Sequence, residues 1–167
     1  MHRTDFGKMH CSIARAGQIV GESWTPLILR DLLLGFTRFE EIREDLGIST
    51  NILTDRLNTL VEHGLVERMP DTDRPDRPSY MLTEKGRDAI SIVLAMLAWG
   101  DRWESDEAGV PTEVLHHRCG NSTHVVMQCA ECGERLHLDE VTYHLGPGSV
   151  AAPGTKLLQH HLEPPLH

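Results

Sequence analysis

The sequence has no apolar run long enough to cross a membrane and no secretion leader. Its longest apolar-rich stretch, Ala89 to Trp99, is interrupted by Ser91, whereas a spanning helix needs about 20 residues. Met1 to Lys8 is polar, and no apolar segment of the kind found in signal peptides follows it. We therefore expect a cytoplasmic protein with no membrane-embedded part.

Positive charge is also scarce. The chain has 16 Lys and Arg against 25 Asp and Glu, a formal net charge of −9, which argues against a non-specific polyanion binder. Of the basic residues, 13 precede residue 105 and only 3 follow it. An anionic partner is therefore expected to contact the first part of the chain.

Apolar periodicity and capping signals predict four helices in the first 64 residues and a long one after them. Thr37 and Glu40 fit a capping box, in which the two side chains satisfy free backbone N–H groups. Thr83 is expected to cap the long helix, which has more apolar residues than one core face requires, so that a dimer partner would cover the excess. The expected helices span 9–21, 23–35, 37–47, 49–64 and 83–103.

A two-stranded ribbon is expected between the fourth helix and the long one. Leu65–Met69 and Ser79–Thr83 alternate apolar and polar residues, and a proline-rich charged segment separates them. Two short helices joined by a glycine turn occur in many all-helical domains, but a ribbon directly after them is typical of a winged helix-turn-helix. The predicted fold is therefore mainly α with a small β-ribbon.

Several motifs follow one another along the first two thirds of the chain. They are Cys11, GESWTPLILR (21–30), Arg38-Phe39, ISTNILTDRL (48–57), HGLVER (63–68), RPSYMLTEKG (77–86) and LAWG (97–100). Together they resemble the HxlR-like family of bacterial winged-helix regulators, over about residues 8–104. The resemblance implies a homodimeric transcription factor, more often a repressor than an activator, that binds an inverted-repeat operator in double-stranded DNA. It also implies that the first and last helices form the dimer interface.

The helix that begins after Ser49 is the candidate reader of base edges. Its leucines define a core side, which leaves polar side chains on the opposite side and near the N-terminus. Asn can pair with adenine and Arg with guanine, each with about 1–3 kcal/mol of discrimination; the alternative is that some only contact phosphate or solvent. The candidates on this helix are Ser49, Thr50, Asn51, Thr54, Asp55, Arg56 and Asn58, and the resemblance adds Arg38.

Arg74 and Arg77 at the ribbon tip are candidates for phosphate or minor-groove contacts. Three neighbouring aspartates offset them, so a salt-bridged, solvated loop is the competing interpretation. A basic face that includes Arg56 would favour DNA binding, whereas an acidic face would favour a protein-interaction module that has lost DNA binding.

Cys11 lies at the expected start of the first helix, beside His10 and near Lys8 and Arg15. A helix N-terminus and adjacent positive groups favour the thiolate, the nucleophilic form. The resemblance implies that Cys11 senses oxidants or a small thiol-reactive effector. The alternative is a small buried residue at the dimer interface.

The last third of the chain contains two similar ligand pairs, His116-x-x-Cys119-Gly and Cys129-x-x-Cys132-Gly. Three thiolates and an imidazole form the tetrahedral set that a structural zinc ion prefers, and the tail resembles a zinc ribbon. The alternatives that remain open are His117, His124 or His137 as the fourth ligand, a redox dithiol, a metal- or redox-responsive switch, and unligated thiols.

We therefore expect three parts and no catalytic site. A winged helix-turn-helix DNA-binding and dimerisation domain occupies 1–105, a zinc-ribbon-like module 110–146, and a flexible tail 147–167. No water-activating carboxylate motif accompanies the metal ligands, so the protein is not expected to be an enzyme.

Overall fold

The computed structural model describes residues 6–70 and 77–162. The chain forms two compact units, one of which spans Ser23–Val126 and the other of which combines the segment up to Glu22 with the segment from Met127 onward. The predicted three-part division at 105, 110 and 147 stays a prediction. Among the described residues no helix is long and apolar enough to cross a membrane.

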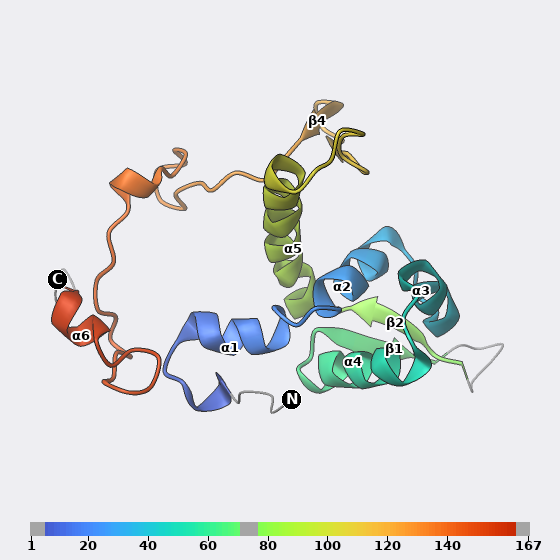
Figure 1. The fold of residues 1–167 in the computed structure, drawn as a ribbon, viewed down its shortest axis with the longest axis horizontal. Helices are drawn as coiled ribbons and strands as arrows, with labels where there is room; N and C mark the ends of the chain where they lie inside the picture. The colour runs from blue at the N-terminus through green and yellow to red at the C-terminus, as the bar shows by residue number, and fades with distance from the viewer. Residues whose placement is uncertain (1–5, 71–76, 163–167) are drawn as a thin grey trace. The chain divides into compact units, whose positions relative to one another are not determined.

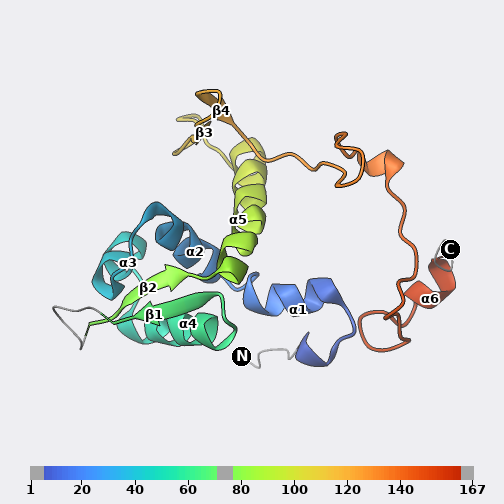
Figure 2. The same cartoon turned by 180° about the vertical axis from the view of Figure 1, so that it is seen from behind.

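The unit Ser23–Val126 has the element order of a winged helix-turn-helix (Figures 1 and 2). Three helices precede an antiparallel ribbon, a long helix follows it, and a second short hairpin comes last, so the predicted mainly helical fold is confirmed. The elements are α2 (Thr25–Leu34), α3 (Phe39–Leu46), α4 (Thr50–Glu62), β1 (Val66–Met69), β2 (Ser79–Leu82), α5 (Glu84–Trp103), β3 (Val114–His116) and β4 (Asn121–Thr123).

Glycine ends α2 and α3 as the sequence predicts. Gly35 follows α2 with φ 95° and Gly47 follows α3 with φ 59°, a left-handed conformation that a residue with a Cβ adopts only with strain. The start of α2 differs from the prediction, because Trp24 rather than Ser23 occupies the N-cap position. Pro26 lies in the first turn, where a missing N–H costs no helical hydrogen bond.

The start of α3 lies one residue later than the predicted capping box. The Arg38 backbone N–H donates to Glu41 Oε2 at 2.9 Å, so Glu41 takes the role expected of Glu40. Arg38 occupies the N-cap position, but its side chain makes no capping hydrogen bond. The shift arises because the Thr37 carbonyl accepts from the Tyr80 backbone N–H at 2.8 Å, which makes Thr37 part of the ribbon. The expectation for Thr37 was therefore wrong.

The core lies where α2, α3, α4 and the ribbon meet. Each side chain buried there contributes about 1.5–3 kcal/mol relative to an exposed one. Residues from α2, α3, α4 and β1, and the loop residue before β1, meet in this core, so it fixes α4 in place. The fully buried apolar side chains are Ile28, Leu29, Ile42, Leu53, Leu57, Leu60, Leu65 and Val66.

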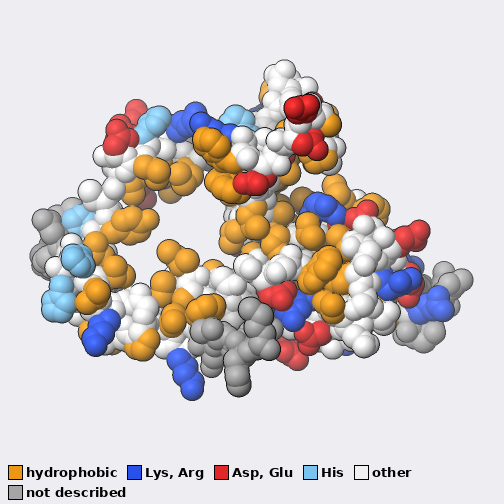
Figure 3. All heavy atoms as spheres, in the orientation of Figure 1, with side chains coloured by type: hydrophobic (Ala, Val, Ile, Leu, Met, Phe, Trp, Pro, Cys, Tyr) orange, Lys and Arg blue, Asp and Glu red, His pale blue; other side chains and the backbone are white. Residues whose placement is uncertain are grey.

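Thr83 caps α5, as predicted, and its hydroxyl also joins α5 to the end of α4. Its Oγ1 accepts from Gly86 N at 3.1 Å and donates to the Gly64 carbonyl at 2.6 Å. The later turns of α5 are only partly covered by their own unit, and hydrophobic side chains are visible over this helix in Figure 3. Its exposed apolar residues include Ile92, Met96, Trp99 and Trp103.

The second unit has little regular structure. Its elements are η1 (Phe6–Lys8), α1 (Ser12–Ile19), η2 (Leu138–Glu140) and α6 (Leu158–His161). Helix α1 is shorter than the predicted 9–21 and has no buried residue. A Cβ placed on Gly154 would lie 3.3 Å from the Cβ atoms of Met9 and Cys11, so the segment around Gly154 packs against the start of α1.

Candidate nucleic-acid interface

Helix α4 is fixed from both its start and its inner side. Ser49 is the N-cap residue, and its Oγ accepts from Ile52 N at 3.4 Å, as predicted. Leu53, Leu57 and Leu60 have no exposed surface. The N-terminus of α4 is therefore held in one orientation by the core, which is what an element that reads base edges requires.

The outward side of α4 divides into a free half and a hydrogen-bonded half. Near the N-terminus, Thr50, Asn51 and Thr54 are exposed. Farther along, the Arg68 guanidinium donates to Asn58 Oδ1, and Arg56 and Asp55 form an ion pair at 2.7 Å. The side chains free to form new hydrogen bonds therefore concentrate in the first turns of the helix.

Arg56 and Arg68 hold positions that the sequence alone did not reveal. The Arg56 side chain is only 12% exposed, although the sequence placed it among the candidates near DNA. Arg68 was not a candidate, yet it contacts α4 and lies 5.9 Å from the centre of the Tyr80 ring. Its role depends on the strand register that pairs Arg68 with Tyr80, and no local pattern encodes that register.

Arg38 and Arg77 lie together where the ribbon meets the start of α3. Arg38 Nη1 donates to the Arg77 carbonyl at 3.4 Å, and both residues are exposed. Arg74, the other predicted contact of the ribbon, lies outside the described residues. Two guanidinium groups at this position can supply charge-assisted contacts to phosphate.

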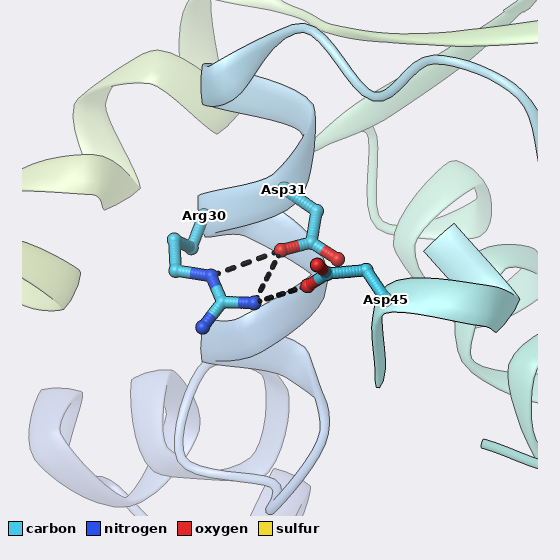
Figure 4. A network of polar contacts seen from close by, with 3 residues as sticks. All are labelled: Arg30, Asp31 and Asp45. Carbon is cyan, nitrogen blue, oxygen red and sulfur yellow. Dashed lines mark hydrogen bonds and ion pairs between the residues drawn. The ribbon is translucent and has the colours of Figure 1, made fainter. Parts of the chain in front are cut away.

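An ion-pair network joins α2 to α3, the helix that precedes α4 (Figure 4). Arg30 Nη2 lies 2.7 Å from Asp31 Oδ1 and 2.7 Å from Asp45 Oδ2. Asp31 has no exposed surface. Burial raises the pKa of the Asp31 carboxyl above its ordinary 3.8, while the Arg30 guanidinium acts in the opposite direction.

Asp31 is expected to make stability depend on pH. A carboxyl whose pKa is raised by folding stabilises the fold most below its unfolded pKa, here 3.8, and that contribution is lost as the pH rises through the folded value. The free energy of unfolding of the wild type should therefore fall relative to that of Asp31→Asn as the pH rises above about 4. Urea unfolding of both proteins across this pH range measures the two free energies. A wild type that becomes more stable relative to Asp31→Asn as the pH rises would contradict a raised pKa of Asp31.

The two predicted metal-ligand pairs form turns of the same kind. Gly120 has φ 72° and donates to the His116 carbonyl at 2.8 Å, while Gly133 has φ 76° and donates to the Cys129 carbonyl at 2.9 Å. In the first pair His116 Nδ1 lies 3.3 Å from Cys119 Sγ. The two turns therefore share the same backbone hydrogen bond and the same positive-φ glycine after the second ligand residue.

Hydrogen bonds at Cys129 favour its thiolate. The backbone N–H groups of Cys132 and Glu131, and then the Cys132 side chain, lower the pKa of the Cys129 thiol. Cys119 belongs to the unit Ser23–Val126, and Cys129 and Cys132 to the other unit. No group of three or more His, Cys, Asp or Glu side chains suited to a metal ion is formed within the described part of the chain.

Cys11 is the N-cap residue of α1 and is half-buried. Its predicted position at the start of the first helix is confirmed. Its side chain makes no capping hydrogen bond, so the thiol is not committed to holding the helix end.

Comparison with known proteins identifies the family. Residues 19–108 match the HxlR-like helix-turn-helix family. The chain belongs to the HxlR-like family. The uncharacterized HTH-type transcriptional regulator Rv3095 of Mycobacterium tuberculosis (strain ATCC 25618 / H37Rv) is 40% identical over 137 residues, which cover 82% of this chain and 87% of the relative.

Solved structures similar to this HxlR-like protein are also regulators. The proposed transcription factor PA1607 matches with a TM-score of 0.75 and 28% identity, over 84% of this chain and 98% of that chain. The redox regulator HypR in its oxidized form matches with a TM-score of 0.53 and 30% identity, over 57% of this chain and 100% of that chain. The predicted helix-turn-helix transcriptional regulator is thereby confirmed.

Proposed function

We propose that this HxlR-like protein is a transcriptional repressor that binds an inverted-repeat operator as a homodimer in the cytoplasm, and that it is not an enzyme. The observation that carries the proposal is the exposed first part of α4, where Asn51 and Thr54 point away from a fully buried leucine face. Asn has the donor and acceptor needed to pair with adenine in the major groove. Arg38 and Arg77 supply the phosphate contacts that set its position on the duplex.

The exposed apolar surface of α5 supports the homodimer. Met96, Trp99 and Trp103 are 49%, 59% and 61% exposed, and apolar surface of this extent in one element is typical of a protein interface. Helix α1 likewise has no buried residue. A second copy would cover both helices and place two α4 helices in successive major grooves, which matches an inverted repeat.

We further propose that Cys11 receives the signal. Its side chain makes no capping hydrogen bond at the start of α1, so the thiol is available to react, and the similar protein HypR is a redox regulator. Because α1 belongs to the expected dimer interface, oxidation or alkylation of Cys11 would shift the two α4 helices relative to each other. Operator half-sites have a fixed spacing, so such a shift costs contacts in both.

Genomic footprinting with the purified full chain, with and without a thiol oxidant, tests these proposals together. We expect protection of an inverted repeat that is lost on oxidation in the wild type and in Cys129→Ser, but retained in Cys11→Ser. If only Cys129→Ser fails to respond to the oxidant, the sensor is in the tail and is not Cys11. The lowered pKa of Cys129 favours this alternative. Absence of any protected repeat would contradict DNA recognition and favour a protein-interaction module.

We also propose that a structural zinc ion is held by His116, Cys119, Cys129 and Cys132. The fit rests on the donor set and on the two matching turns, each with a positive-φ glycine after its second ligand. Zinc bound to four protein ligands would contribute folding energy and supply no open position for catalysis. The residues of each turn orient their own ligand pair through the hydrogen bonds described above.

The zinc proposal predicts a defined metal content. Purified protein should contain about one zinc ion per chain, since a structural site takes four protein ligands and a single ion. Cys129→Ser should lose most of it, whereas the matched variant Cys11→Ser should retain it. Elemental analysis measures the content, and the same zinc content in Cys129→Ser and wild type would contradict the ligand set. Retention in His116→Ala would assign the fourth ligand to His117, His124 or His137.

A further inference from the structure

Ile52 is an exposed apolar side chain within the polar, N-terminal part of α4. It is the third residue of the helix and is 42% exposed, while its neighbour Leu53 is completely buried. Thr50 and Asn51, which precede it in the first turn, are polar and exposed. Ile52 therefore lies in the part of α4 that holds the free hydrogen-bonding groups.

Packing within the chain covers only part of the Ile52 side chain, which stays 42% exposed. Its backbone N–H serves the cap of α4 by donating to Ser49 Oγ, which any residue other than proline can do. A β-branched side chain is a weaker helix former than alanine, lysine or glutamate. The exposed part of the side chain gains nothing from water, and an apolar group of a bound partner would cover it.

In the major groove the C5 methyl of thymine is the apolar group that base edges present to a side chain such as isoleucine. The geometry points to Ile52 as a specificity-determining residue that packs on a thymine methyl in each operator half-site. This inference rests on the proposed DNA recognition by α4 and adds an apolar contact to the hydrogen bonds of Asn51. It assigns thymine, and not merely an A·T pair, to one position of the half-site.

Deoxyuridine, which lacks only the C5 methyl group, isolates this contact. Each thymine of the footprinted operator is replaced in turn, in both half-sites symmetrically, and binding is measured by fluorescence anisotropy. Loss of one buried methyl in each half-site should weaken wild-type binding by about 15-fold at one thymine position. In Ile52→Ala the same replacement should change binding less than about two-fold. Asn51→Ala is the matched control, and it should remain sensitive to deoxyuridine.

The outcomes separate this inference from the function on which it rests. Protection of an inverted repeat together with deoxyuridine insensitivity at every thymine overturns the inference alone. Equal sensitivity of wild type and Ile52→Ala also overturns it, because the methyl would then contact another residue. A wild-type chain that protects no inverted repeat overturns both proposals. Thermal unfolding of Ile52→Ala verifies that the variant is folded, as its 42% exposure predicts.

Discussion

Replacing Gly86 by alanine is expected to lower the free energy of unfolding by about 3 kcal/mol or more. Gly86 lies in the first turn of α5, where a Cβ would be 2.0 Å from the Leu65 carbonyl oxygen and 3.2 Å from Leu82 Cδ2. The same carbonyl accepts from the Thr83 backbone N–H at 3.0 Å, so it cannot move without breaking a hydrogen bond. The alanine variant must therefore displace α5 from the ribbon.

Gly100→Ala is the matched control, because Gly100 belongs to the same helix. A Cβ at Gly100 meets no atom within 4 Å, so this substitution should raise stability by about 0.5–1 kcal/mol through helix propensity alone. Urea unfolding of the wild type and both variants measures the two effects. A Gly86→Ala protein as stable as the wild type would show that α5 does not approach the end of α4 closely.

Local signals predicted the helices well because their causes are local. Gly35 and Gly47 end α2 and α3 in the left-handed conformation, and Ser49 and Thr83 cap α4 and α5 through their own side-chain oxygens. Each of these features depends on residues no more than four positions apart. The sequence therefore contains all the information needed to place these helix ends.

The predictions that changed depend on contacts between distant segments. Thr37 is a good capping residue by type, but its carbonyl pairs with Tyr80 N, and the cap moves to Arg38. Asn58 has the right position to face DNA, but Arg68 donates to it from the neighbouring strand. Such contacts depend on ribbon register and strand placement, which residue periodicity does not specify.

The same distinction separates the candidates for base recognition on α4. Asn51 and Asn58 have identical side chains on the outward surface of one helix, and the sequence favours Asn51 only because it lies nearer the N-terminus. The structure ranks them, because the Asn58 amide oxygen already accepts from Arg68 whereas Asn51 is exposed. A base contact from Asn58 would require breaking the existing hydrogen bond, at a cost of about 1.5–3 kcal/mol for one with a charged donor.

Asn51→Ala is therefore expected to weaken operator binding far more than Asn58→Ala. A lost bidentate contact to adenine costs about 1–3 kcal/mol, and because a dimer carries the substitution twice, the dissociation constant should rise by about 30-fold or more. Asn58→Ala should raise it by less than about three-fold, since Asn58 is engaged by Arg68. Fluorescence anisotropy with the footprinted operator at fixed salt measures both. Equal losses for the two variants would mean that Arg68 releases Asn58 on DNA, and the first turns of α4 would then not be the principal reading surface.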